Sequence, residues 1–184
     1  MMAGTPPPKS PPPKPVPEEI DKGFEEADDD TRTPEERAAT VINHATAQAA
    51  FWGAWPAVSW VALVMINMTM IVFIGRAYGQ LWDKEKARGL LFQILKGMGL
   101  STGLLLAGGK FINDALKLTG LGTIPAMAAD AVLCGAVTYA VGYTAETYFK
   151  QDGQMSKQAL KAAFKEQYRQ ARQRITENPP EAGR

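Results

Sequence analysis

The chain has 184 residues, a formal net charge of +1 and 46% hydrophobic residues, which suffices for one domain and requires no second. A single cysteine, Cys134, excludes an intramolecular disulfide, and with only one histidine the usual multi-ligand zinc and iron–sulfur sites are excluded too, so we expect no metal and no cofactor. The near-neutral average hides a segregation of charge, because residues 1–37 hold ten acids and five bases whereas residues 150–184 hold eight bases and four acids.

Residues 1–32 form a polar segment rich in proline, lysine and acids, with Phe24 as its only aromatic. Such a segment buries too little apolar surface to offset the entropy of ordering, which predicts a disordered tail. Its proline triplets at 6–8 and 11–13 are also of the kind that protein partners bind, although a solvated tail is the simpler interpretation. The first residues lack an apolar run, so we expect no cleavable secretory signal.

An amphipathic helix is predicted over residues 33–50. Thr33 can cap it, Pro34 suits the first helical position, and Glu36 completes a capping box. The helix is rich in alanine and carries His44, the one histidine of the chain. In these surroundings we interpret His44 as structural or solvated rather than as a ligand or a base.

Residues 51–149 are predicted to form a helical membrane domain. The segment 51–75 has no charged residue and is longer than the roughly twenty residues that a bilayer-spanning helix needs. Three tryptophans crowd its start, as aromatic belts often do. The alternative, a buried helix of a soluble bundle, would normally be shorter and show a polar stripe. Further spans are predicted over 97–118 and 124–149, the former being short enough for a re-entrant half-helix.

Between the first two spans, residues 76–96 are predicted to include an amphipathic helix that lies at the membrane interface. Its apolar side is formed by four residues on one side of the helix, Leu90, Leu91, Ile94 and Leu95. The segment also carries more bases than acids, as cytoplasmic loops of membrane proteins do. The positive-inside rule therefore places it, together with the basic C-terminus, on the cytoplasmic side.

Polar side chains at membrane depth are the main candidates for a functional site. They share helix faces and are Lys110, Asn113, Asp114, Asp130 and Thr138. An ionisable group at this depth needs a partner or water. These groups therefore either pair within the two predicted spans 97–118 and 124–149, for example Lys110 with Asp130, or line a polar path for an ion or solute when several subunits associate.

Small residues four apart in the second predicted span favour close packing of two membrane helices. They are Gly99, Gly103 and Ala107. This spacing predicts self-association, so we expect a homo-oligomer in the bilayer.

We predict that Gly153 ends the helix of the span 124–149 and that Ser156 caps the last helix, within a C-terminal segment 150–184. This last helix is predicted to be amphipathic and basic. Its basic stripe consists of Lys157, Lys161, Lys165, Arg169 and Arg172. A thinner apolar stripe consists of Leu160, Phe164, Ala171 and Ile175. Such a helix can lie along an anionic leaflet or bind a partner, and the alternative is a solvated face on a helix that packs against its own domain. Nucleic acid is not expected as a partner, because the chain offers no reading element.

Several short landmarks in fixed order resemble the YcjF-type family of uncharacterised bacterial membrane domains. They are Ala49-Ala50, Pro56, Met70, the Arg-Ala-Tyr-Gly turn at Arg76–Gly79, Ile124-Pro125, Thr138-Tyr139, Gly142, Tyr148-Phe149 and Gly153. In that family the domain occurs alone or behind Era-like or dynamin-like GTPase domains. One departure is Ala126, where members often have glycine after the proline. Only a polar tail precedes the landmarks here, so the resemblance implies that any nucleotide-dependent role comes from a separate partner.

We expect a non-enzymatic integral membrane anchor or scaffold of the all-α class, which self-associates and recruits a partner through its termini. No nucleophile elbow, phosphate-binding loop or metalloprotease motif is present, so no catalytic residue is predicted. The bacterial inner membrane is the expected location. The alternative function is a small oligomeric channel or transporter, with Lys110, Asp114 and Asp130 lining the path.

Overall fold

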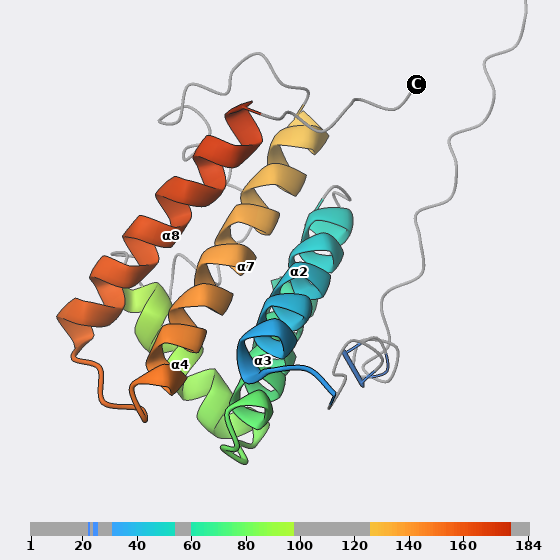
Figure 1. The fold of residues 1–184 in the computed structure, drawn as a ribbon. Helices are drawn as coiled ribbons and strands as arrows, with labels where there is room; N and C mark the ends of the chain where they lie inside the picture. Colours follow the sequence, from blue (N-terminus) through green and yellow to red (C-terminus); the bar gives the residue numbers. More distant parts are fainter. Residues whose placement is uncertain (1–21, 23, 26–30, 54–59, 98–125, 178–184) are drawn as a thin grey trace, which may run out of the picture.

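The computed structural model describes residues 22, 24, 25, 31–53, 60–97 and 126–177, and this part of the chain is all-α, as predicted. Its five long helices are α2 (Pro34–Gly53), α3 (Trp60–Ala77), α4 (Lys84–Gly97), α7 (Ala126–Lys150) and α8 (Lys157–Glu177). In Figure 1, α2 and α8 lie on opposite sides of α7, α3 lies partly behind α2, and α4 crosses behind the lower part of α7. The central helix is α7, because it packs against each of the other four.

The close approach of three helices depends on Gly142 of α7. A Cβ atom at this position would lie 2.7 Å from Cγ1 of Ile42 on α2 and 3.0 Å from Sδ of Met70 on α3. Glycine is therefore the residue that lets α2 and α3 reach the backbone of α7. One to two turns along, Gly135 of α7 faces Thr46 and Ala50 of α2. Residues later in α2 therefore face residues earlier in α7, so these two helices run antiparallel.

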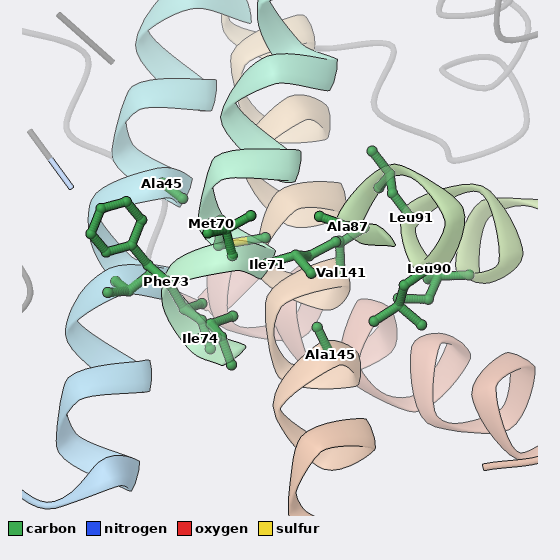
Figure 2. Packing of buried hydrophobic residues seen from close by; sticks show 14 of the residues in the cluster. Ala45, Met70, Ile71, Phe73, Ile74, Ala87, Leu90, Leu91, Val141 and Ala145 are labelled. Atoms are coloured by element: carbon green, nitrogen blue, oxygen red, sulfur yellow. The ribbon is translucent and has the colours of Figure 1, made fainter. Parts of the chain in front are cut away.

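The hydrophobic core lies where α3 passes between α2, α4 and α7. Figure 2 shows side chains from these helices meeting there, among them Met70 of α3, Leu91 of α4 and Val141 of α7. The side chains of Met70 and Leu91 are almost entirely buried. Burial of this kind is the main driving force that holds the helices together.

The predicted helix ends are confirmed by their hydrogen bonds. The backbone N–H of Glu36 donates to Oγ1 of Thr33 (3.3 Å), and the backbone N–H of Thr33 donates to Oε2 of Glu36 (3.0 Å). Ser156 caps α8 by accepting a hydrogen bond from the N–H of Ala159 (3.1 Å). Gly153 has a φ of +77°, which glycine adopts without strain, and it follows the end of α7. These motifs are local, which is why sequence alone suffices to predict them.

The first predicted span, 51–75, falls on two helices. Its first three residues belong to the end of α2, residues 54–59 lie outside the described part of the chain, and residues 60–75 belong to α3. The predicted span 97–118 also lies outside the described residues, apart from Gly97 at the end of α4. Helix α7 covers nearly the same residues as the predicted span 124–149. In the described part of the chain, no helix has both the length and the apolar sequence that a membrane crossing requires.

The apolar side of α4 does not face lipid, so that prediction is wrong. Leu90, Leu91, Ile94 and Leu95 are at most 4% exposed and belong to the core. The amphipathic pattern was real, but the surface that covers its apolar side is protein.

Phe24 departs from the predicted disordered tail. Its side chain is fully buried, with its ring stacked on Phe73 (5.6 Å between centroids) and set edge-on to His44 (5.2 Å). Aromatic pairs in stacked and edge-on arrangements add to the stabilisation that burial of the ring provides. His44, half-buried beneath Phe24, thus has a packing role, as the sequence suggested. The rest of this segment, residues 1–21, 23 and 26–30, lies outside the described part of the chain.

Candidate functional site

Most of the polar residues predicted at membrane depth lie outside the described part of the chain. These are Lys110, Asn113 and Asp114, and the predicted packing residues Gly99, Gly103 and Ala107 lie outside it as well. For Asp130 the structure describes its place on α7 and not its side chain. Of the predicted polar set, only Thr138 can be assigned its contacts.

Thr138 joins two helices. Its side chain is 1% exposed, and its Oγ1 accepts a hydrogen bond from Nδ2 of Asn67 on α3 (3.2 Å). The same amide group of Asn67 donates to the backbone oxygen of Leu63 (2.8 Å). A buried hydroxyl that is hydrogen-bonded between packed helices fixes how α3 and α7 lie against each other. This contact favours a packing role for Thr138 over a place on an open polar path.

One end of the helix bundle exposes apolar side chains. This apolar end comprises the C-terminal end of α2 and the N-terminal halves of α3 and α7, which lie together at the top of Figure 1. Phe51 and Val61 are exposed there, and the partly buried apolar residues are Trp52, Leu63, Val64, Met65, Met68, Val132, Leu133 and Val137. Five of these partly buried residues, Trp52, Val64, Met65, Met68 and Val137, also pack against the core. Val61 is 61% exposed and Phe51 is 57% exposed. Further down α3, in contrast, every side chain in 69–74 is buried by the other helices.

The basic stripe of α8 is largely exposed, whereas its apolar stripe is buried. Lys157, Lys161, Lys165 and Arg169 are exposed, and Arg172 is partly exposed. Leu160, Phe164 and Ala171 are buried against the domain, and the side chain of Ile175 lies outside the described part. The helix therefore cannot lie along a leaflet by inserting these three residues. The sequence pattern left open whether lipid or protein covers that stripe, and the answer is protein.

A contact that the sequence analysis missed joins the end of α8 to α7. Nη1 of Arg174 donates a hydrogen bond to Oη of Tyr139 (2.8 Å), and its guanidinium carbon lies 5.5 Å from the centre of the same ring. Arg174 follows the basic stripe by two residues, and the pair is 35 residues apart in sequence. No short-range pattern links two residues at that distance.

A polar cluster lies at the opposite end of the bundle from the apolar end. Oη of Tyr78, just after α3, donates to Oε1 of Glu146 on α7 (3.0 Å), and the ammonium group of Lys150 lies 3.0 Å from the same oxygen. Glu146 is only 7% exposed. Burial of the phenol, followed by the charge of Glu146 and its hydrogen bond, raises the pKa of Tyr78 well above its ordinary value. The cluster therefore ties the turn after α3 to α7.

Replacing Tyr78 with phenylalanine is expected to lower the free energy of unfolding by about 2 kcal/mol, because a buried carboxylate loses a donor. The raised pKa of Tyr78 means that its contribution is present below the ordinary tyrosine pKa, near 10, and is lost as the pH rises above it. Urea unfolding at pH 7 to 11 should show the two proteins converging at high pH. Tyr148→Phe is the control, since the structure shows Tyr148 in ring contacts with Trp82 and Phe149. A difference in unfolding free energy between the two proteins that grows as the pH rises would contradict this account.

Among the residues that the structure describes, no acidic, histidine or cysteine side chains gather in a group of three or more that could hold a metal. A family model described as "Domain of unknown function (DUF697)" matches residues 26–173. No curated protein and no solved structure matches the chain. The matched range covers most of the chain and contains the polar cluster, the apolar end and the basic stripe. The chain therefore belongs to the DUF697 family.

Proposed function

We propose that this chain is a non-enzymatic helical scaffold of the bacterial inner membrane, whose apolar end enters the bilayer. The observation that carries the proposal is the exposure of Phe51, Val61 and their apolar neighbours on three adjacent helices. The described residues from Ala38 to Gly75, and those from Ala131 to Ala145, include no charged side chain. An apolar surface of this kind, without charges to keep it in water, favours contact with lipid.

The opposite end of the molecule suits a partner rather than lipid. It carries the charged start of α2, the cluster around Glu146 and the exposed lysines of α8. We therefore place partner recruitment there and on the proline-rich N-terminal segment, and we place self-association in the membrane. Asp130, near the start of α7, requires a partner or water at this depth, and Lys110 is the partner that the sequence suggests.

A YcjF-type relationship and a separate GTPase partner are parts of the same proposal. The landmarks that carry the resemblance support a shared fold, because Met70, Gly142 and Phe149 occupy packing positions in the core. Tyr78 and Gly153, two further landmarks, lie at the ends of helices. The alternative, a channel with Lys110, Asp114 and Asp130 along its path, gains no support from a described side chain.

A charge placed at the apolar end is expected to weaken membrane association strongly. Val61→Asp adds a carboxylate where the proposal places lipid, and an aspartate costs roughly 3 kcal/mol at the centre of a bilayer and less near its surface. We expect at least a tenfold loss of partitioning into phosphatidylcholine vesicles, measured by flotation of the purified full-length chain.

Leu81→Asp is the matched control. Leu81 is the most exposed of the large apolar residues described, at 86%, but it lies in the α3–α4 connection at the opposite end. The same substitution there should leave flotation unchanged. If the wild-type chain stays at the bottom of the gradient, or if both variants float as the wild type does, the proposed function is wrong.

A further inference from the structure

We propose that α8 is divided along its length: Arg169, Arg172 and Arg174 bind the phosphate groups of anionic lipids, whereas Lys157 and Lys161 stand clear of the membrane. The proposal rests on the proposed function, because it needs the apolar end to enter the bilayer. It adds the lipid class that is recognised, the residues that recognise it and the depth to which the bundle enters.

The depth follows from Tyr139. On the N-terminal side of Tyr139, the α7 side chains of Val132, Leu133 and Val137 are only partly buried, and most of the side chains beyond it, up to Phe149, are covered by other helices. Tyrosine prefers the boundary between lipid and water, because its ring is apolar and its hydroxyl forms hydrogen bonds. We therefore place the membrane surface at the level of Tyr139.

The Arg174–Tyr139 hydrogen bond relates α8 to that level. Figure 1 shows α8 running alongside α7, so distances along α8 translate into distances from the surface. A helix rises 1.5 Å per residue, which places Arg172 about 3 Å and Arg169 about 8 Å from the level of Arg174. Lys161 and Lys157 then lie about 20 and 26 Å away.

Screening of charge by salt gives the bases different roles according to their distance from the membrane surface. At physiological salt the Debye length is about 8 Å, so the three arginines feel the charge of an anionic surface and the two distant lysines do not. Burial of Leu160 and Phe164 prevents α8 from lying flat, which would have brought all of these bases to the surface together.

The kinds of base agree with this division. The guanidinium group of arginine donates two parallel hydrogen bonds to a phosphate group and is more weakly hydrated than an ammonium group. All the bases of α8 near the Tyr139 level are arginines, and those far from it are lysines. The arginines also make contacts within the protein. Arg169 pairs with Glu166 (2.9 Å) at an exposed position, where such a pair is weak, and Arg174 keeps its hydrogen bond to Tyr139 (2.8 Å).

The test compares two double variants of the same helix in the full-length chain. Arg172→Gln with Arg174→Gln removes two bases near the proposed surface, and Lys157→Gln with Lys161→Gln removes two bases far from it. Binding is measured by flotation with vesicles of phosphatidylcholine alone and of phosphatidylcholine mixed with phosphatidylglycerol. Melting curves followed by circular dichroism check that both variants fold.

A base near an anionic surface contributes about fivefold to binding, so the arginine variant should bind the anionic vesicles about 25-fold more weakly than the wild type. The lysine variant should differ by less than twofold, and both should bind neutral vesicles as the wild type does. Equal losses in the two variants, or no loss in either, would overturn the division of α8 while leaving the proposed function standing. Absence of wild-type binding to both kinds of vesicle would instead overturn the proposed function.

Discussion

Replacing Phe149 with alanine is expected to lower the free energy of unfolding by about 3–5 kcal/mol. Phe149 is 1% exposed, and its ring lies edge-on to Trp82, with 4.9 Å between the ring centroids. On another side the ring comes so close to α3 that a Cβ atom on Gly75 would lie 3.2 Å from its Cζ atom. The surrounding core relaxes only partly when such a buried side chain is removed, so a cavity remains. Urea unfolding followed by circular dichroism measures the loss.

Phe51→Ala is the matched control for that experiment. The same side chain is removed there, but it is 57% exposed, so the loss should stay below about 1 kcal/mol. Comparable losses at the two positions would contradict the packing of Phe149 described above.

Gly142→Ala is expected to destabilise the fold by about 1–2 kcal/mol, although alanine is a better helix former than glycine by about 1 kcal/mol. The added methyl group would lie 2.7 Å from Cγ1 of Ile42, closer than two carbon atoms can approach. Ile42 and Met70, on the other two helices, are fully buried and have little room to move. The three helices must therefore separate, which weakens the contacts along all of them. The free energy of unfolding, again from urea titration, is the measurement.

Gly89→Ala should have the opposite sign, which makes it a sharp control. Gly89 lies in α4, and a Cβ atom there would meet nothing within 4 Å, so only the gain in helix propensity applies. Ile42→Ala, introduced together with Gly142→Ala, should recover part of the loss by making room for the methyl group. A stabilising effect at Gly142 would show that α2 and α7 are not in close contact.

Local features of the fold were predictable. The capping box of Thr33 and Glu36, the cap at Ser156 and the glycine after α7 each depend on residues at most five apart. The exposed basic stripe of α8 also follows from spacing alone, because residues three and four apart share a helix face. Interactions between residues so close along the chain can be predicted from the sequence alone.

Two assignments to lipid or solvent failed for a common reason. Leu91 of α4 belongs to an apolar stripe that the periodicity showed correctly but that was assigned to the membrane interface, and it proved to be covered by protein. Protein also covers Phe164, in the stripe of α8 for which the sequence left the covering surface open. Phe24, in a segment too polar to fold by itself, is buried because Phe73 and His44 provide a place for it. An amphipathic pattern shows that a face must be covered, and it does not show by what.

By itself, the sequence determined the helical class, the start of α2, the end of α7, the start of α8 and the side of α8 that carries the bases, because backbone hydrogen bonding and side-chain periodicity act over a few residues. Only the tertiary structure decided which apolar faces meet each other and which remain exposed at the apolar end. Those contacts join residues far apart along the chain, such as Asn67 with Thr138, 71 positions away, and Ile42 with Gly142. Burial depends on the shape of every helix that surrounds a residue, and no single segment contains that information.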